Sequence, residues 1–566
     1  MCGLTLSLRF VGDPDHTPPH SEIDSLININ SRRGPDSSAI FKKVFTTCEG
    51  CHVELVLATS VLGLRGNGVT SQPIISERGV LGWNGQVFDG LQVKPGENDT
   101  RKVFDKLEGG ENPWDILDKI EGPYAFIYLN LETSTLYFAV DPLSRRSLLV
   151  HPSIENLIDP VRLLVLSSTR SSVVREAGWS MQELDGETRV AIRLLDIQKA
   201  KDEQGKKVTP HPYVISKADK KDRFGRINDA IPDSISTTPT IDDIHLFIQN
   251  LTESIRKRTE NISVQSPGIA RIAVLFSGGV DCTLLCGLLH RVLPPDEPVE
   301  LVNVAFDRPD PSPSLTKKDS RKKGEKRRKE NSEMWLVPDR LSGIEALKEL
   351  GTVCPREWRF VEVNVTYDEC QIHRQEVLDL MYPSKKEMDL SLAYPLFFAS
   401  RGQGEVSGHD GKEPYQVQAK VYFSGLGADE QLGGYSRHRR AYERSSWKGL
   451  IEEIQNDVWR LPSRNLSRDD RLVSSFARDA RYPYLDLKFL SYLSSLPIWL
   501  KCQLSSDPAH VPGKGDKMLL RLAAAQIGLE KTSLRVKRAM QFGSRSSKMG
   551  SGIKGPKAGE YELDMG

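Results

Sequence analysis

The sequence predicts two domains of different fold class, a layered α+β domain over residues 2–225 and a doubly wound α/β domain over residues 240–545. Three observations lead to this prediction. At 566 residues the chain is longer than one hydrophobic core usually holds. The first part alternates short apolar runs with turn residues, whereas the second part alternates unbroken apolar runs with helical patterns.

Apolar runs in the first 225 residues predict a series of strands. Gly, Asn and Asp lie between the runs, as expected for turns. The runs are "VELVLATSVLGL" (53–64), "GVLGWNG" (79–85), "YAFIYLNLETSTLYFAV" (124–140) and "LLVLSSTR" (163–170). Residues 184–214 predict a closing strand followed by a polar linker, which completes a strand-rich layered domain.

The second domain begins with "RIAVLF" (271–276), a short unbroken apolar run typical of a buried parallel strand. The residues that follow predict a helix whose apolar face consists of Leu284, Leu285, Leu288, Leu289 and Val292. Further strands are predicted at "VELVNVAF" (299–306), "FVEVNV" (360–365) and "VYFSG" (421–425). Helical stretches between the strands indicate a parallel sheet of the doubly wound kind.

Two segments interrupt this pattern. Residues 309–333 are predicted to be a disordered basic insertion, because "KKDSRKKGEKRRK" (317–329) is mostly basic, with Ser and Gly between. A nuclear-import or anion-binding patch is the other interpretation of this run. Residues 546–566 are predicted to form a flexible tail, because Gly, Ser and Lys are frequent there.

Charge and cysteine content narrow the function classes. Lys and Arg total 77 against 76 for Asp and Glu, so a net charge of +1 gives no global argument for nucleic acid or an anionic membrane. No apolar run approaches the roughly 18–20 residues of a membrane span, and no signal peptide is recognisable. Eight cysteines in a chain of this length predict reduced thiols and a cytoplasmic location. Cys48 and Cys51 have C-x-x-C spacing, but no second pair follows, so we interpret them as incidental.

The residue after the initiator methionine is Cys2, and we expect Met1 to be removed because the cysteine side chain is small. Cys2 would then carry a thiol and a free α-amine. An α-amine has a reference pKa of about 7.7–8.0, low enough to serve as a base near neutral pH. Nucleophile and base on one residue are the arrangement of the N-terminal-nucleophile hydrolases.

Several motifs follow Cys2 in a fixed order, and together they are far more specific than any one of them. They are "RRGPD" (32–36), "LGLRG" (62–66), "WNGQVF" (83–88), "ENDT" (97–100) and "EGPYAF" (121–126). This set resembles the class II glutamine amidotransferase domain, which has the N-terminal-nucleophile fold. The resemblance implies that residues 2–225 bind glutamine and release ammonia from it.

The resemblance assigns a role to each matching residue of the first domain. Cys2 would attack the side-chain amide of glutamine, and Asn84 with the backbone N–H of Gly85 would form the oxyanion hole. Arg65 would bind the α-carboxylate of glutamine, and Asp99 would bind its α-ammonium group.

The second domain carries a loop, "VLFSGGVDCT" (274–283), directly after a predicted buried strand and before a helix. Glycines let backbone N–H groups converge on an anion, and the helix N-terminus adds its dipole. The lysine of a Walker A loop and the G-x-G-x-x-G spacing are both absent. The loop resembles the pyrophosphate loop of enzymes that split ATP into AMP and pyrophosphate.

A second piece, "FSGLGADEQLGGYSRHR" (423–439), resembles the adenylate-binding loop of asparagine synthetases, and "GDKMLLR" (515–521) matches farther on. The resemblance spans Cys2 to about Arg545 and implies ATP and Mg²⁺ as cofactors. Asp281 and Asp429 would hold magnesium, and Lys517 would neutralise charge on the α-phosphate or the leaving pyrophosphate. The remaining assignments are pyrophosphate contacts from Ser277, Gly278, Gly279 and Asp281, and an adenosine pocket lined by Leu275, Ser424 and Gly425.

The chain departs from the asparagine synthetase pattern at two positions. Leu426 replaces the glutamate that faces the reacting acyl group in the family, and Cys282 replaces a serine. Leucine can neither accept a proton nor stabilise an ammonium ion. These departures, with "VPDRLSGIEAL" (337–347) and "KRAMQFGSR" (537–545), resemble a divergent eukaryotic branch, the asparagine synthetase domain-containing proteins.

Three functions follow from these observations. The first is glutamine-dependent amidation of an aspartate-like carboxylate, with ATP converted to AMP and pyrophosphate. The second is a catalytically impaired descendant that acts as a nucleotide-binding regulator or scaffold, which Leu426 favours. The third is an ATP pyrophosphatase with another acceptor such as a tRNA base, and we rank it last because residues 317–329 contain no aromatic residue. We expect no membrane partner, and the sequence leaves both a monomer and a homo-oligomer open.

Overall fold

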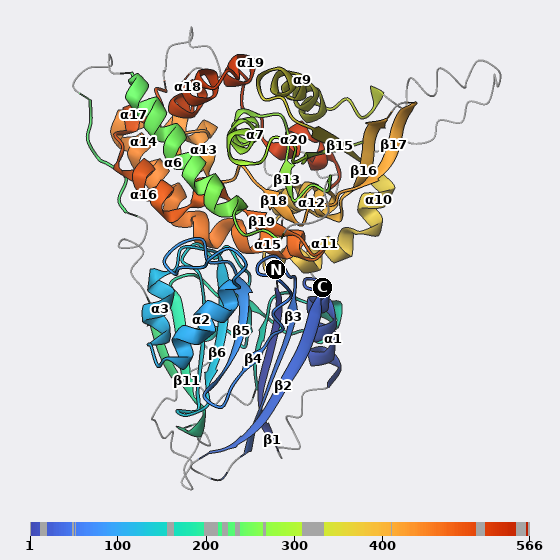
Figure 1. Cartoon of the computed structure of the whole chain (residues 1–566), viewed down its shortest axis with the longest axis vertical. Coiled ribbons are helices and arrows are strands. Elements are labelled where there is room, and N and C mark those ends of the chain that lie inside the picture. Colours follow the sequence, from blue (N-terminus) through green and yellow to red (C-terminus); the bar gives the residue numbers. More distant parts are fainter. Residues whose placement is uncertain are drawn as a thin grey trace, which may run out of the picture.

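The computed structural model places a strand-rich N-terminal domain beneath a C-terminal domain in which helices surround a sheet (Figure 1). The structure describes residues 2–11, 20–47, 50, 52–155, 163–196, 213–217, 225–232, 238–263, 268–307, 333–408, 410–504, 515–550 and 562–563. Cys48, Cys51 and the predicted basic insertion up to residue 332 lie outside the described residues.

The N-terminal domain contains two sheets, each six-stranded in the part of the chain that is described. The first sheet has the order β10-β8-β9-β1-β3-β2, formed by β1 (Cys2–Val11), β2 (Ser37–Thr46), β3 (His52–Val61), β8 (Leu149–His151), β9 (Leu163–Ser167) and β10 (Gln182–Glu183). The second has the order β12-β11-β7-β6-β5-β4, formed by β4 (Ile74–Ile75), β5 (Gly79–Gly85), β6 (Tyr124–Asn130), β7 (Thr135–Val140), β11 (Thr188–Arg193) and β12 (Tyr213–Lys217). Neighbouring strands in these two sheets run antiparallel in the described residues.

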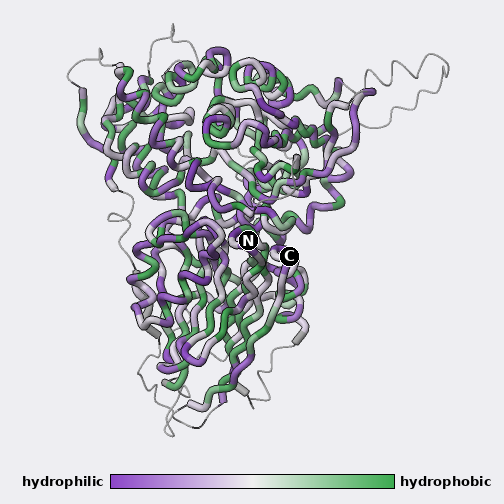
Figure 2. The backbone as a smooth tube through the Cα atoms, in the orientation of Figure 1, coloured by the Kyte–Doolittle hydropathy of each residue, from purple (hydrophilic) through white to green (hydrophobic). Residues whose placement is uncertain are grey.

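The two sheets face each other across one hydrophobic core. Side chains alternate between the faces of a strand, so Leu4, Leu6 and Leu8 of β1 all point into this core. Ile127 of β6 and Phe138 of β7 meet them from the second sheet. Figure 2 shows the corresponding concentration of hydrophobic residues along the strands of the N-terminal domain.

Helices cover the outer faces of both sheets. They are α1 (His20–Ser31) and α4 (Ser172–Glu176) on the first sheet, and α2 (Asp99–Glu108) and α3 (Pro113–Lys119) on the second. Leu26 of α1 packs with Val165 of β9, and Phe104 of α2 packs with Trp83 of β5. The four layers are helix, sheet, sheet and helix, so the layered α+β arrangement predicted from the sequence is confirmed.

The C-terminal domain contains a sheet that is seven-stranded in the described ranges, with the order β17-β16-β15-β14-β13-β18-β19. Its strands are β13 (Ile272–Leu275), β14 (Val299–Phe306), β15 (Trp358–Val365), β16 (Gln403–Gly408), β17 (Gly411–Gln416), β18 (Val421–Phe423) and β19 (Asp479–Arg481). The parallel strands are β15, β14, β13, β18 and β19, and the hairpin of β16 and β17 adds an antiparallel edge beside β15. The apolar runs predicted to be strands all lie in the parallel part.

Helices cover both faces of this sheet, as expected for a doubly wound arrangement. Ile272 and Val274 of β13 pack on one face with α7, whereas Ala273 packs on the other with α12. The longer helices are α6 (Ile241–Thr259), α7 (Val280–Val292), α9 (Pro338–Val353), α11 (Arg374–Met381), α12 (Glu387–Arg401), α14 (Ser436–Arg464), α15 (Leu466–Ser474), α16 (Leu487–Ser495) and α18 (Met518–Gln526). The shorter ones are α10 (Tyr367–Ile372), α13 (Ala428–Gln431), α17 (Ile498–Lys501), α19 (Glu530–Ser533) and α20 (Met540–Gly543), with 3-10 turns η3 (Pro483–Leu485) and η4 (Ser546–Lys548). A further 3-10 turn, η2 (Leu194–Asp196), belongs to the N-terminal domain.

The end of the chain departs from the expectation of a flexible tail wherever it is described. Met549 and Leu563 are buried in the core that α12 shares with β14, and Glu562 bridges to Lys386. The sequence did not predict this burial, because Gly, Ser and Lys dominate the composition of the segment. Met549 and Leu563 are single apolar residues within it, and their side chains anchor it to the core. Among the described helices none is both long and apolar enough to cross a membrane.

Candidate functional site

Cys2 is the first residue of β1, at the end of the N-terminal domain that faces the C-terminal domain. Its partner in the sheet is Val61 of β3, and its side chain is buried. The backbone nitrogen of Cys2 donates a hydrogen bond of 2.9 Å to Oδ1 of Asn84, in β5 of the facing sheet. The structure therefore brings the predicted nucleophile and the predicted oxyanion-hole residue together across the two sheets.

Only one end of the Asn84 side-chain amide makes a hydrogen bond to a described residue. Its Oδ1 accepts from Cys2, whereas Nδ2 is buried and has no hydrogen-bond partner among the described residues. Gly85 follows it at the end of β5, and a side chain there would lie 2.6 Å from the carbonyl oxygen of Pro123. A buried N–H without an acceptor is costly unless a ligand supplies one, so this arrangement fits a group that binds an oxygen atom.

The environment of the thiol includes a residue that the sequence analysis missed. Gln72 lies between β3 and β4, and its Nε2 is 3.6 Å from Sγ of Cys2. Its Oε1 accepts a hydrogen bond of 2.7 Å from the backbone of Trp83, which fixes the amide orientation. Burial raises the pKa of the Cys2 thiol, so the resting group is protonated near neutral pH.

Arg65 and Asp99, the residues predicted to bind glutamine, form a buried pair in the same region. The distance from Nη1 of Arg65 to Oδ2 of Asp99 is 3.6 Å. Both side chains also hold the backbone of Val87, since Arg65 donates to its carbonyl oxygen at 2.7 Å and Asp99 accepts from its N–H at 2.9 Å. Nε of Arg65 is buried without a partner in the described structure, so this guanidinium retains a free donor.

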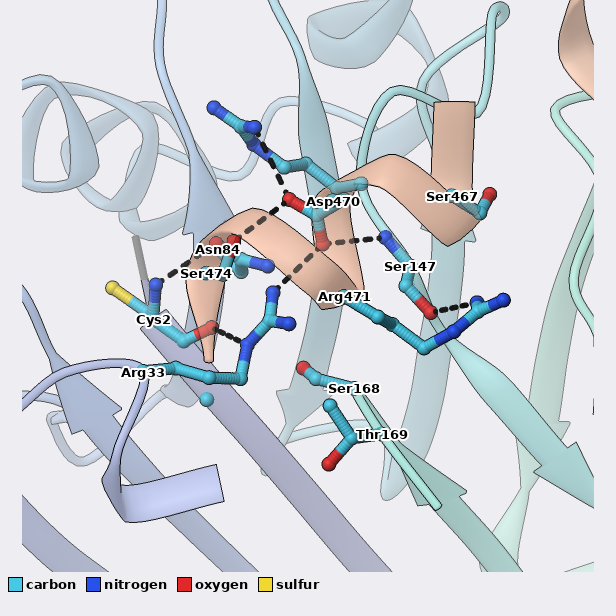
Figure 3. A network of polar contacts seen from close by, with 12 residues as sticks. Cys2, Arg33, Asn84, Ser147, Ser168, Thr169, Ser467, Asp470, Arg471 and Ser474 are labelled. Atoms are coloured by element: carbon cyan, nitrogen blue, oxygen red, sulfur yellow. Dashed lines mark hydrogen bonds and ion pairs between the residues drawn. The ribbon is translucent and has the colours of Figure 1, made fainter. Parts of the chain in front are cut away.

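Arg33 connects the thiol residue to the C-terminal domain (Figure 3). Its Nε donates to the carbonyl oxygen of Cys2 at 3.3 Å, and its Nη2 donates to Oδ2 of Asp470 at 2.7 Å. Asp470 lies in α15 and also accepts from Arg146 at 3.2 Å and from the backbone of Ser147 at 3.1 Å. The sequence placed Arg33 in a motif but gave no indication of this contact, because the two partners are 437 residues apart.

The second cluster of predicted residues lies where β13 ends and α7 begins. Gly278 has a φ of +75°, and a side chain there would lie 2.3 Å from the backbone of Ser342 in α9, so glycine is required. The hydroxyl of Ser342 donates to the carbonyl oxygen of Ser277 at 2.8 Å. Ser277 in turn accepts from the backbone N–H of Gly279 at 3.3 Å. The loop is thus held in a tight turn at the N-terminus of a helix.

Asp281 lies in the first turn of α7 and Asp429 in the first turn of α13, and the two carboxylates share one ammonium group. Nζ of Lys517 lies 2.8 Å from Oδ2 of Asp281 and 3.0 Å from Oδ1 of Asp429. Burial alone would lower the pKa of Lys517, but the two carboxylates outweigh it and hold that pKa above its usual value. Burial raises the pKa of Asp281, and Lys517 offsets this only in part. The two predicted metal carboxylates are therefore close enough to bind the same cation.

A second lysine, which the sequence analysis missed, also reaches this centre. Nζ of Lys537 lies 2.7 Å from Oδ2 of Asp429. Burial acts to raise the pKa of Asp429, but Lys517 and Lys537 outweigh it and hold the pKa well below its usual value. Lys537 belongs to the segment 537–545 that the sequence singled out, although no residue pattern predicted its contact with Asp429.

The remaining predicted nucleotide contacts surround the same loop. Ser424 follows β18, its N–H donates to the carbonyl oxygen of Arg481 at 3.0 Å, and its Oγ accepts from the N–H of Leu426 at 3.3 Å. A side chain at Gly425 would lie 3.1 Å from Cβ of Asp281, so these two loops touch. Leu275 ends β13 and packs partly buried against the core on the α12 side of the sheet.

Leu426 and Cys282 are the two positions at which the chain departs from the asparagine synthetase pattern. Leu426 packs against an apolar cluster that includes Leu485 and Leu143, the latter from the N-terminal domain. The thiol of Cys282 donates to the carbonyl oxygen of Gly279 at 3.3 Å and lies 3.7 Å from the Ser277 hydroxyl. Neither side chain supplies a carboxylate or a hydroxyl to the loop.

No family model matches the chain. The structure of the allosteric regulatory enzyme of purine biosynthesis is 14% identical with a TM-score of 0.27, covering 57% of this chain and 69% of that one. A glutamine phosphoribosylpyrophosphate amidotransferase from B. subtilis has 13% identity and a TM-score of 0.25 over 57% of this chain and 70% of that one.

Sequence relatives match over nearly the full length. Asparagine synthetase domain-containing protein 1 of Homo sapiens is 32% identical and covers 97% of this chain and 95% of its own length. The protein of the same name from Bos taurus is 34% identical over 97% of this chain and 96% of its own length. A Saccharomyces cerevisiae asparagine synthetase domain-containing protein is 30% identical over 95% of this chain and 91% of its own length. The chain belongs to the asparagine synthetase domain-containing protein family.

Proposed function

We propose that this protein transfers ammonia from glutamine to an aspartate-like carboxylate in a reaction that consumes ATP, giving asparagine, glutamate, AMP and pyrophosphate. The observation that carries the proposal is the buried contact of 2.9 Å between the Cys2 nitrogen and Asn84 Oδ1, with Asn84 Nδ2 left free beside it. This supports the proposal, because a nucleophile, a nitrogen base and an oxyanion donor around one point are what the glutaminase step requires.

In the first half-reaction the Cys2 thiol gives its proton to its own nitrogen, which becomes an α-amine once Met1 is removed. Sγ then forms a bond to the amide carbon of glutamine, and the C–N bond breaks to release ammonia with the transferred proton. Asn84 Nδ2 donates to the oxygen on which negative charge develops. Water hydrolyses the thioester to glutamate, which restores the thiol. The free Nε of Arg65 and the carboxylate of Asp99 provide charges for the two ends of the amino acid.

The second centre fits ATP and magnesium. Asp281 and Asp429 already share a cation, and Mg²⁺ needs only one or two carboxylates because water and phosphate oxygens complete its shell. No group of three or more His, Cys, Asp or Glu side chains in the described ranges could hold a metal ion, so the phosphates would have to contribute. With ATP bound, the carboxylate substrate would be activated on the α-phosphate as pyrophosphate leaves, and attack of ammonia on the activated acyl carbon would release AMP. Lys517 would then move its charge from the carboxylates to the phosphate oxygens, and the Gly278 turn would cradle pyrophosphate.

The test is to incubate the purified protein with glutamine, aspartate and Mg-ATP, and to measure glutamate, asparagine and pyrophosphate. Wild type should form all three products. Cys2→Ala should form asparagine from added ammonia but not from glutamine. Equal product formation from glutamine by both proteins, or none by either, would overturn the proposal.

We also propose a cytoplasmic location, because all six cysteines in the described ranges are free thiols.

A second candidate function is a nucleotide-binding regulator whose amidation step is lost. Leu426 favours it, because this side chain packs against apolar residues where a carboxylate would be needed to assist ammonia. Calorimetry that shows tight ATP binding with no turnover of any acceptor would support this candidate. Glutaminase activity that depends on Cys2 would contradict it. Leu426→Glu distinguishes the two further, since amide formation should increase only if the missing carboxylate limits the reaction.

A further inference from the structure

A hollow lined by three arginines lies on α14, outside the residues assigned so far. Arg437, Arg460, Ser463 and Arg464 enclose a volume of about 380 Å³. In a straight helix Arg437 and Arg460 would lie about 34 Å apart, because each residue adds about 1.5 Å. Backbone torsions outside the helical range at Ser445 and Ser446 break α14, and this kink folds its second half back on the first.

The hollow has more positive charge than the carboxylates beneath it neutralise. Oδ2 of the buried Asp457 accepts from Arg437 at 2.5 Å and lies 2.8 Å from Nε2 of His438. Arg437 also pairs with Glu453, with 3.5 Å from its Nε to Oε1, and Arg464 lies 3.9 Å from Oδ1 of Asp457, so two carboxylates face three guanidinium groups. Arg460 is exposed and makes no ion pair with any described residue.

Three guanidinium groups around one hollow repel each other unless an anion joins them. Guanidinium groups bind carboxylate and phosphate oxygens through paired N–H donors, and such charge-assisted hydrogen bonds are among the stronger polar contacts in proteins. The hydroxyl of Ser463 lies at the rim, where it donates to the carbonyl oxygen of Arg460 at 3.3 Å. The hollow therefore has the size and the donors for an oxyanion.

A single aromatic ring separates the hollow from the second centre. The guanidinium carbon of Arg437 and Nζ of Lys537 each lie 4.0 Å from the centroid of the Tyr435 ring. Lys537 is the lysine that binds Asp429 at 2.7 Å. The hydroxyl of Tyr435 donates to Glu430 at 2.5 Å, which fixes the ring between the two cations. An anion in the hollow would thus be one aromatic ring away from Lys537, which binds a residue that we propose to hold magnesium.

We propose that Arg437, Arg460 and Arg464 form an anion subsite that binds a phosphate or carboxylate group of a molecule handled at the second centre. Two sources have this chemistry, the second acid group of the carboxylate substrate and the leaving pyrophosphate. The choice between these sources rests on the proposed function, whereas the binding of an anion does not.

The test measures binding of two probes, inorganic pyrophosphate and succinate, by titration calorimetry of the full chain at low ionic strength, where screening is weak. Arg460→Gln removes one lining guanidinium without breaking an ion pair in the described structure. Arg444→Gln is the matched control, because Arg444 is exposed on the same helix but does not line the hollow. We expect Arg460→Gln to weaken binding of at least one probe about tenfold, the loss typical of one charge-assisted hydrogen bond, and Arg444→Gln to leave it unchanged.

The pattern of losses identifies which molecule supplies the anion, and it distinguishes failure of the subsite from failure of the proposed function. A loss with succinate alone assigns the subsite to the substrate, a loss with pyrophosphate alone assigns it to the leaving group, and a loss with both supports a general oxyanion site. If Arg460→Gln and Arg464→Gln both bind the two probes as Arg444→Gln does, the subsite is overturned. Because no turnover is needed, absence of amide formation would overturn the proposed function and leave this readout intact.

Discussion

Arg33 of the N-terminal domain and Asp470 of the C-terminal domain form an ion pair in which both side chains are fully buried, with 2.7 Å between Nη2 and Oδ2. The same guanidinium donates to the carbonyl oxygen of Cys2. Asp470 also pairs with Arg146 at 3.2 Å, so one carboxylate neutralises two arginines at the domain boundary. The residue that carries the proposed nucleophile is therefore tied directly to the other domain.

Replacement of this carboxylate should strongly destabilise the protein. Asp470→Ala leaves Arg33 and Arg146 buried without their shared partner, and breaking a buried pair in this way costs about 3–5 kcal/mol. The free energy of unfolding in urea measures the effect. Glu132→Gln is a suitable control, because its pair with Arg78 is half exposed and should contribute nothing measurable. Equal stability of the two variants would show that the buried pair is not important for the fold.

Asp479 should make part of the stability depend on pH. Burial acts to raise its pKa, but Arg146 and Arg481 outweigh this and lower the pKa from 3.8 to about 2. A folded-state pKa below the unfolded one gives stability that is complete above pH 3.8 and is lost as pH falls to about 2. The ionised Asp479 carboxylate contributes about 2 kcal/mol to the free energy of unfolding. Urea unfolding between pH 6 and pH 2 should therefore show a shallower acid dependence for Asp479→Asn than for wild type, and identical slopes would contradict this.

The sequence predicted strands and layers well, because apolar periodicity is local. "RIAVLF" became β13, and Leu284, Leu285, Leu288 and Leu289 are all buried on α7. The strand β12 was missed, since "HPYV" lies beyond a polar stretch that predicted only a linker. Met549 was missed for a similar reason, because one apolar residue in a polar segment has no periodicity.

The site was predicted less completely than the fold. The resemblance named Cys2, Asn84, Asp281 and Asp429, and the structure brings them together in two clusters. Contacts such as Gln72 with Cys2 could not be predicted, because they join side chains from separate loops with no common spacing. The same holds for Arg33 with Asp470 and for Lys537 with Asp429, which only the packing of distant segments creates.

Removal of the oxyanion donor should reduce glutaminase activity. Asn84→Ala deletes the free Nδ2 near the thiol, and loss of one such donor lowers kcat by about 100–1000-fold. The rate of glutamate release at saturating glutamine measures the effect. Asn67→Ala provides a control in the same domain, because its amide lies near Gly96 rather than near Cys2. An increase in KM with unchanged kcat for Asn84→Ala would contradict the assigned role, because it would indicate loss of substrate binding alone.

Lys517 should be needed at the second centre alone. Lys517→Gln removes the ammonium shared by Asp281 and Asp429, so we expect ATP–pyrophosphate exchange to decrease by about 100-fold or more while glutaminase activity persists. Lys448→Gln, at an exposed position of α14, should leave both activities unchanged. If exchange continues at the wild-type rate in Lys517→Gln, the lysine has only a structural role.

The most direct test of the central claim, a glutamine cleft built around Cys2, is labelling with a glutamine analogue that carries an electrophilic ketone. Intact-mass and peptide analysis should find one adduct, on Cys2, and excess glutamine should prevent it. Retained Met1, an adduct on another cysteine, or labelling that glutamine does not slow would contradict the account.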